Sequence, residues 1–146
     1  MKINLLTIGH KMPNWVAEGF HEYQERLPKD YQLNLIALKP QINMSKEGEE
    51  LLAAIPPNNF VIALDRLGVA IKTQELSIKL LNWHDNAQDI SLLIGGAEGL
   101  STECLQRAAQ TWSLSTLTLP HQLVRIVVAE QIYRAWTILN KHPYHK

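Results

Sequence analysis

The chain has 146 residues, of which 46% are hydrophobic and 19% are charged. This length suits a single domain, and no apolar run approaches the roughly 18 residues that span a bilayer, so membrane spanning and wholesale disorder are excluded. Fourteen Lys and Arg residues balance fourteen Asp and Glu residues, which excludes the global positive field of a nonspecific nucleic-acid binder, and any RNA contact must be local. The single cysteine, Cys104, excludes an intramolecular disulfide and a four-cysteine zinc site. No signal-peptide cleavage site follows the short apolar start, so we expect a cytoplasmic protein.

Strand-like and helix-like patterns alternate along the whole chain. Short, nearly continuous apolar runs predict buried strands, and apolar residues that recur every three to four positions predict helices. In chain order, we expect strands at residues 3–8, 33–37, 60–64, 90–94 and 114–119, and helices at residues 13–27, 45–55, 76–83, from 101 and from 121 to 139. Ser45 and Ser101 are the expected caps of the second and fourth helices.

This alternation predicts an α/β fold, with one domain over residues 1–146, a mostly parallel sheet and helices on both faces. In such folds a ligand site lies outside the carboxyl ends of the strands. The last helix is apolar most of the way round, with Val128 on one side and Tyr133 on another. A helix with only a narrow wet stripe must be enclosed, and one small domain offers few places for this, so we expect a homodimer.

Three of the seven glycines, Gly95, Gly96 and Gly99, lie within five residues between a predicted strand and a capped helix. Such a turn lets a ligand approach the main chain, and a side chain placed there would occupy the ligand's space. A plain strand-to-helix turn explains the segment equally well. Only Gly9 follows the first strand, and no GxxxxGK[ST] motif is present, so dinucleotide-binding and phosphate-loop interpretations are weak.

Several polar residues stand at predicted strand ends or on the last helix. Asp65 ends the central strand, where a turn-forming role before Gly68 is the simpler interpretation. His121 begins the last helix, and Glu130 and Arg134 are spaced to pair across one helical turn. Each of these residues, taken alone, is more simply explained by structure than by chemistry.

The C-terminal residues 142–146 combine two imidazoles, an aromatic ring and a cation. Aromatic and imidazole rings stack on unpaired bases and Lys neutralises phosphate, so the segment suits single-stranded RNA, with a frayed polar end as the alternative. His142 and His145 lack a third partner at metal-ligand spacing, so we expect no metal site.

Four segments occur in order along the second half of the chain: IGGAEGL (residues 94–100), LTLPHQLVR (117–125), EQIYRA (130–135) and YHK (144–146). Together they resemble the ribosomal large subunit methyltransferase H family, and the likeness runs from Gly9-His10-Lys11 to the last residue. This family belongs to the SPOUT superfamily. The resemblance therefore implies a C-terminal trefoil knot, which ordinary chain topology lacks.

The resemblance also implies an obligate homodimer that transfers a methyl group from S-adenosylmethionine to N3 of a pseudouridine in the helix 69 loop of bacterial 23S rRNA, within the assembled ribosome. Backbone of three loops is expected to hold the cofactor, at Leu64, Gly96, Ser115, Thr116, Leu117, Thr118, Leu119 and Pro120. Arg134, Tyr144 and His145 are the expected catalytic residues. A cation near the uracil oxygens favours the ionised imide, and His145 or a perturbed Tyr144 accepts its proton, with His121 a weaker candidate.

Two departures from the family pattern keep alternatives open. The stretch between Pro40 and Glu47 is several residues shorter than in many relatives, and Ala97 replaces a residue that is often Pro. The shortened stretch leaves room for a SPOUT methyltransferase with another RNA target. A ribosome-binding protein that keeps the fold without methylating is the non-enzymatic alternative, against which the cofactor-loop residues argue.

Overall fold

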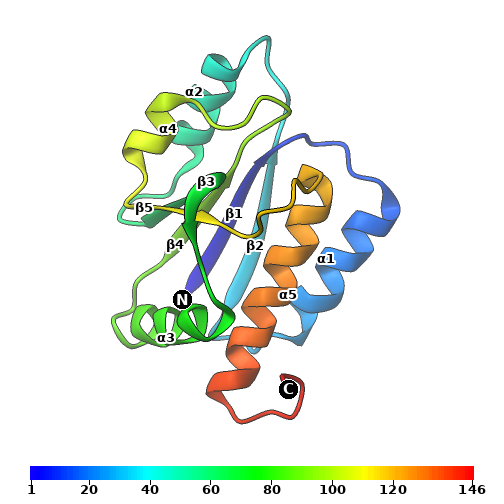
Figure 1. Ribbon diagram of the computed structural model, residues 1–146, viewed down its shortest axis with the longest axis vertical. Helices are drawn as coiled ribbons and strands as arrows, with labels where there is room; N and C mark the ends of the chain where they lie inside the picture. The colour runs from blue at the N-terminus through cyan, green and yellow to red at the C-terminus, as the bar shows by residue number, and fades with distance from the viewer.

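The computed structural model describes all residues, 1–146, and it has the predicted α/β architecture (Figure 1). Five strands form one sheet in the order β2-β1-β4-β3-β5, and every pairing is parallel. The elements are β1 (Lys2–Ile8), α1 (Asn14–Arg26), β2 (Gln32–Leu38), α2 (Met44–Ala54), β3 (Phe60–Ala70), α3 (Thr73–Asp85), β4 (Ile90–Ile94), α4 (Thr102–Arg107), β5 (Gln110–Ser113) and α5 (His121–Leu139).

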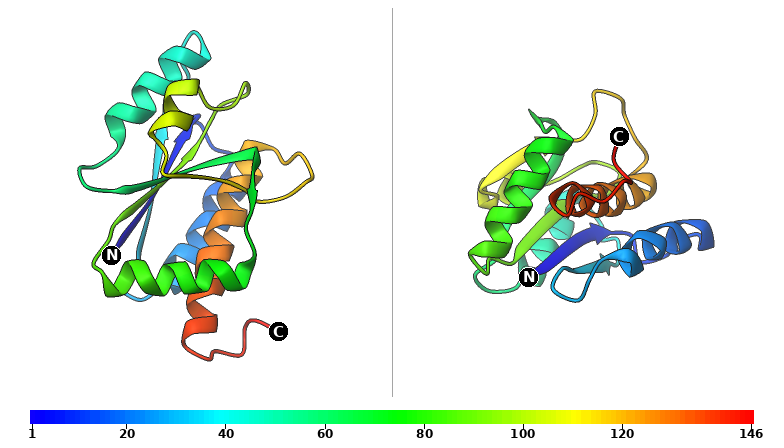
Figure 2. Two further views of the ribbon diagram at one scale, coloured as in Figure 1. Left: turned by 60° about the vertical axis from the view of Figure 1, so that its left-hand side comes forward. Right: turned by 90° about the horizontal axis from the view of Figure 1, so that it is seen from below.

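Helices cover both faces of the sheet. Helices α1, α3 and α5 lie on one face, where α5 runs between the other two (Figure 2), and α2 and α4 cover the other face. Side chains of β1 alternate between the two layers, with Leu5 in the larger core and Leu6 in the smaller one. Each such fully buried leucine contributes roughly 1.5–3 kcal/mol relative to an exposed one, so both layers hold the sheet in place.

Strand β3 is longer than predicted because its far end carries a large bulge. Leu64 and Val69 both lie opposite Trp112 of β5, so residues 65–68 leave the ladder between them. Gly68 sits directly on the neighbouring strand, where a Cβ would lie 2.7 Å from backbone atoms of Thr111 and Trp112. The bulge thus projects a polar loop from the carboxyl end of β3.

Helix α5 is largely covered by its own chain. None of its residues is fully exposed, because α1 and α3 flank it and the sheet lies beneath it. The single chain therefore covers much of this helix, while more than half of its residues are only half-buried. The homodimer itself stays a prediction, as does the trefoil knot.

Two of the predicted local features differ from the structure. The cap of α2 is Asn43, whose side chain accepts a hydrogen bond from the Lys46 backbone N–H at 2.9 Å, and Ser45 lies inside the helix. The predicted strand at residues 114–119 is also wrong, because β5 ends at Ser113 and those residues form a loop. Leucines alternating with Ser and Thr imitate strand periodicity there. Ser101 caps α4 as expected, accepting from the Cys104 N–H at 3.2 Å.

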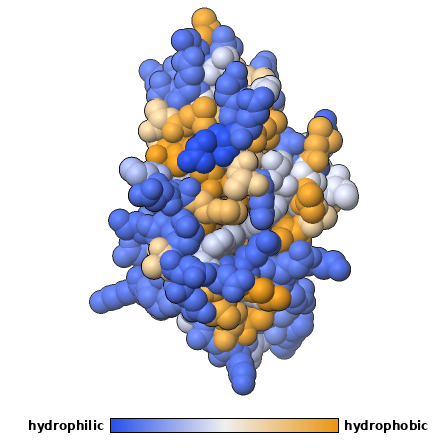
Figure 3. All heavy atoms as spheres, turned by 90° about the vertical axis from the view of Figure 1, so that its left-hand side faces the viewer, coloured by the Kyte–Doolittle hydropathy of each residue, from blue (hydrophilic) through white to orange (hydrophobic).

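Apolar side chains on the surface gather in separate patches with polar side chains between them (Figure 3). Ile78 and Leu81 are the exposed large apolar residues of α3, while Leu67, Val69 and Leu117 surround the carboxyl end of β3 and the loop after β5. None of the helices is both long enough and apolar enough to cross a membrane. No group of three or more His, Cys, Asp or Glu side chains is placed to hold a metal ion.

Candidate active site

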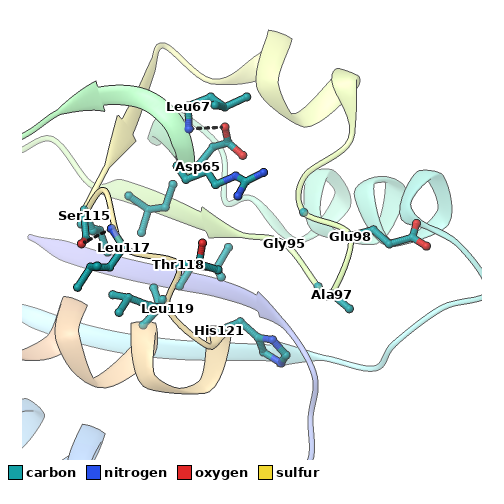
Figure 4. Close-up of a pocket in the computed structure, with 17 residues that line it drawn as sticks. Asp65, Leu67, Gly95, Ala97, Glu98, Ser115, Leu117, Thr118, Leu119 and His121 are labelled. Atoms are coloured by element: carbon teal, nitrogen blue, oxygen red, sulfur yellow. Dashed lines mark hydrogen bonds between the residues drawn. The ribbon is translucent and has the colours of Figure 1, made fainter.

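A cavity of about 520 Å³ opens at the carboxyl ends of β3, β4 and β5, where an α/β fold places its ligands. Three connecting segments line it: the bulge after Leu64, the glycine turn at residues 95–99, and the loop at residues 114–119. Figure 4 shows the three segments facing one another, with His121 at the start of α5 closing one side. Segments far apart in the sequence thus form one concave surface.

The backbone of the glycine turn requires glycine at two of its positions. A Cβ on Gly95 would lie 2.2 Å from the carbonyl carbon of Gly99, and Gly99 adopts a φ of +88° that L side chains rarely reach. The turn is closed by a hydrogen bond from the Gly99 N–H to the Gly96 carbonyl at 3.0 Å. A Cβ on Gly96 would meet Glu47 Oε1 at 2.9 Å and Ile8 at 3.4 Å. Neither residue lines the cavity, so a side chain at Gly96 would press on α2 and β1, contrary to the expectation that it fills ligand space.

Asp65 holds the shape of the bulge after β3. Its Oδ2 accepts a hydrogen bond from the Leu67 backbone N–H at 3.0 Å, which confirms the turn-forming role (Figure 4). Asp65 and Arg66 also line the cavity, together with Glu98 of the glycine turn. Sequence reasoning missed Arg66 and Glu98, and only their positions beside Asp65 and within the glycine turn could have pointed to them.

Serine side chains shape the loop between β5 and α5. Ser113 Oγ donates to the Ser115 carbonyl at 3.0 Å. Ser115 Oγ accepts from the Leu117 N–H at 2.9 Å (Figure 4). These local bonds replace the hydrogen bonds of a strand ladder, so residues 114–119 form a loop although their leucines alternate as in a strand. Leu117 remains 72% exposed at the rim.

The structure gathers most of the expected cofactor-loop residues around this cavity. Of the eight, the lining includes Leu64, Gly96, Ser115, Leu117, Thr118 and Leu119. Thr116 and Pro120 are not in contact with the cavity, and Pro120 instead sets the start of α5. His121, the weaker catalytic candidate, does line it.

The cavity suits an amphipathic nucleoside-type ligand. Apolar side chains of Leu64, Ile94, Leu114 and Val124 offer contacts for a flat base, and the lining also includes hydroxyl groups, charged groups and the glycine turn. The volume is within the usual range for small-molecule sites. S-adenosylmethionine, with an adenine ring and a zwitterionic methionine end, has the chemistry that these residues can hold.

A second cluster of candidate residues lies where the C-terminal tail folds back on α5. The Arg134 guanidinium stacks over the Tyr144 ring at 4.8 Å from its centroid and lies 3.1 Å from His145 Nδ1. Arg134 also pairs with Glu130, as its spacing predicts, and the bond to that carboxylate raises the pKa of Arg134. Partial burial raises the pKa of Tyr144, so its hydroxyl stays protonated at neutral pH. The three expected catalytic residues are thus neighbours.

This tail cluster and the cavity are well separated within one chain. His121 lines the cavity at the first turn of α5, and Arg134 lies thirteen residues further along the same helix. At a rise of 1.5 Å per residue, the two positions are about 20 Å apart along the axis. One copy of the chain therefore does not bring the expected catalytic residues to the cavity.

Comparison with known proteins gives a consistent result. A family model described as "Predicted SPOUT methyltransferase" matches residues 1–145. Proteins called "Ribosomal RNA large subunit methyltransferase H" from Marinomonas sp. (strain MWYL1) and Coxiella burnetii (strain Dugway 5J108-111) are 47% and 46% identical, with both chains covered in full.

Solved structures of methylase-family proteins share the fold. A probable methylase family protein from Haemophilus influenzae Rd KW20 aligns with a TM-score of 0.61 at 14% identity, over 99% of this chain and 70% of that one. A putative methylase family protein from Neisseria gonorrhoeae aligns with a TM-score of 0.57 at 10% identity, over 96% and 93%. At these identities the likeness concerns the fold alone.

Proposed function

This chain belongs to the SPOUT methyltransferase family and, within it, to the ribosomal RNA large subunit methyltransferase H proteins, and from this premise we propose that it methylates N3 of a pseudouridine in the helix 69 loop of 23S rRNA, with S-adenosylmethionine as the methyl donor. The observation that carries the proposal is the cavity at the strand ends, which three separate loops line with six of the eight expected cofactor residues. Balanced charge is compatible with such a substrate, because one loop in a large particle can be recognised by local contacts and shape.

We propose further that the active site is shared between two copies in a homodimer. The roughly 20 Å along α5 that separates His121 from Arg134 prevents one copy from completing the site. In a symmetric dimer, the tail cluster of one protomer can face the cavity of its partner, and the same contact is made twice. The distance within one chain, rather than the apolar surface of α5, supports this assembly.

Methyl transfer to N3 is an in-line displacement in which the N–C bond forms as the C–S bond of the sulfonium breaks, and N3 loses its proton to a base. The bound donor supplies an electrophilic methyl group, and the residues of this chain supply orientation and charge. Arg134 stays cationic because Glu130 holds it, so it can stabilise negative charge on the uracil oxygens and favour the ionised imide. Tyr144, whose pKa is raised, suits stacking and hydrogen-bond donation better than proton abstraction.

The decisive experiment incubates purified protein with radiolabelled S-adenosylmethionine and ribosomes that lack the modification, and then maps the label in rRNA. We expect label on the helix 69 pseudouridine. Label on another nucleotide would support the alternative of a SPOUT methyltransferase with a different RNA target, which the short stretch at residues 40–47 keeps open. Ribosome binding without any label would support the non-catalytic alternative.

A further inference from the structure

An exposed loop at the edge of the cavity is held in place by hydrogen bonds with β2 and α5. Residues 9–13 connect β1 to α1, and the loop begins at Gly9 with a φ of +111°. The Gly9 N–H donates to the Leu38 carbonyl at 2.7 Å, and Gln122 Nε2 reaches the Lys11 carbonyl at 3.5 Å. The loop has a defined backbone path although His10 and Lys11 are exposed.

The central contact comes from a buried arginine. Arg125 of α5 is completely inaccessible to solvent, and its Nη2 donates to the carbonyls of Ile8 and Gly9 at 3.0 and 2.8 Å. No carboxylate pairs with it, and its Nε and Nη1 have no hydrogen-bond partner. A buried cation without a counter-charge is costly, since arginine is almost never fully buried unless it is paired. The fold tolerates this cost where the arginine side chain helps to fix the start of the loop.

The loop lies directly beside the candidate active site. A Cβ on Gly9 would lie 3.1 Å from Arg125 Nη2 and 3.9 Å from Nε2 of His121, which lines the cavity. Strand β2 ends next to β1, and Lys39 follows it at the same edge of the sheet. Lys11 and Lys39 are exposed and form no salt bridge. Because the Gly9 N–H bonds the Leu38 carbonyl, Lys39 stands close to the same loop as Lys11, and this loop reaches the cavity at His121.

We propose that residues 9–13, together with Lys39, form the surface that binds backbone phosphates of the RNA substrate beside the target nucleotide. The inference rests on the proposed function. It assigns a substrate-binding role to Lys11 and Lys39, which lie outside the cofactor loops and the tail cluster. Flexible ammonium groups neutralise phosphates without reading sequence, and a fixed backbone sets where those groups stand. The loop thereby positions the RNA strand relative to the cavity, in a chain with no net charge to attract RNA over its whole surface.

The test measures binding of undermodified ribosomes to the full-length protein over a series of KCl concentrations, for Lys11→Ala, Lys39→Ala and the double variant. Each lost phosphate contact on single-stranded RNA should reduce the slope of log K against log salt by about 0.7. If variant and wild type bind equally at 1 M salt, the variant then binds about fivefold more weakly than wild type at 0.1 M salt. The KM for ribosomes should rise, while kcat and the calorimetric affinity for S-adenosylmethionine stay at wild-type values.

Lys2→Ala provides the matched control. Lys2 is an exposed lysine at the amino end of β1, whereas Lys11 lies in the loop that follows the carboxyl end of this strand. We expect it to bind ribosomes with the wild-type slope. A wild-type slope and KM for Lys11→Ala and the double variant would overturn the assignment, and so would a loss of cofactor affinity in these variants, because the loop would then belong to the cofactor site.

Failure of this inference is distinguishable from failure of the proposed function. If wild-type protein labels helix 69 but the lysine variants bind normally, only the phosphate surface is wrong. If wild-type protein binds ribosomes without labelling them, the methylation proposal fails, and the salt slopes of the variants still decide about the loop. No ribosome binding by the wild-type protein would overturn both.

Discussion

Arg134 Nη1 donates a hydrogen bond to Nδ1 of His145, 3.1 Å away. A guanidinium carries only donors, so Nδ1 must be the acceptor and the ring proton must be on Nε2. The lone pair with which His145 could accept the imide proton is therefore engaged while the tail lies against α5. We infer that His145 becomes a base only when this bond opens, as a substrate or a partner protomer could cause.

Arg134→Met should abolish most methylation without affecting the cofactor site. Loss of one positioned electrostatic donor costs about 10²- to 10³-fold in rate, and Arg134 is far from the cavity along α5. Single-turnover methylation of ribosomes measures the rate, and calorimetry measures the affinity for S-adenosylmethionine. Arg107→Met, an exposed arginine of α4, is the control and should keep the wild-type rate. A rate for Arg134→Met within a few-fold of wild type would contradict the role.

Mixed dimers should recover activity that each parent variant lacks. Leu119→Trp fills the cavity and Arg134→Met removes the tail cation, so each homodimer has two defective sites. If each site combines the cavity of one protomer with the tail of the other, a heterodimer retains one intact site. Random exchange makes about half of the dimers mixed, so about a quarter of the wild-type activity should return. Light scattering that reports a monomer, or mixtures that stay inactive after exchange, would exclude the shared site.

Deleting Tyr144–Lys146 should abolish methylation and leave the affinity for S-adenosylmethionine within about twofold of wild type. None of these residues lines the cavity, whereas Tyr144 packs edge-on against Tyr133 at 4.8 Å and covers Arg134. Tyr144→Phe keeps the ring and should retain more activity than the deletion. Near-normal methylation by the truncated protein would identify the tail as a frayed end and return attention to His121.

How far the sequence predicts the fold depends on whether a feature is local. The strand at residues 90–94 and the Ser101 cap follow from contiguous patterns, and both are present in the structure. The bulge after Leu64 is not predictable in this way, because it depends on how β3 meets β5 rather than on its own residues. The loop after Ser113 has the alternating leucines of a strand, but its serine hydroxyls bond the backbone locally and no strand forms.

The same distinction applies to the candidate site. Family motifs predict Gly96 and Leu64 as cofactor-loop residues, and both line the one cavity. The role of Arg125 is not predictable, because a sequence shows an arginine on a helix but not that it is fully buried and bound to the carbonyls of Ile8 and Gly9. Likewise, the family motifs make both Arg134 and His121 candidate site residues. They do not reveal that the two residues of one chain lie about 20 Å apart along α5.

Cys104 should make stability fall in alkaline solution. Burial raises the pKa of the Cys104 thiol above its ordinary value of 9.0, because the thiolate would be desolvated. The folded state then holds the thiol proton more tightly than the unfolded state. The contribution of Cys104 to the free energy of unfolding is therefore complete below about pH 9 and is lost as the pH rises above it. Denaturant unfolding at pH 7 and pH 10 measures the loss, and Cys104→Ala should show a smaller difference between the two. Rapid reaction of the native thiol with a disulfide reagent at pH 8 would contradict its burial.

Gly95→Ala and Gly96→Ala should differ sharply although the two residues are adjacent. A Cβ on Gly95 would overlap the backbone of Gly99 and Leu100, which cannot move without opening the turn, whereas a Cβ on Gly96 meets the flexible end of Glu47 at 2.9 Å. We expect Gly95→Ala to lower the free energy of unfolding by about 1–3 kcal/mol and the cofactor affinity by about tenfold or more, and Gly96→Ala to change the affinity only a few-fold. Adding Glu47→Ala should restore the cofactor affinity of the Gly96→Ala variant but not that of the Gly95→Ala variant. Calorimetry and thermal unfolding test both variants, and equal losses of cofactor affinity at the two glycines would show that the side-chain direction at Gly96 has been misassigned.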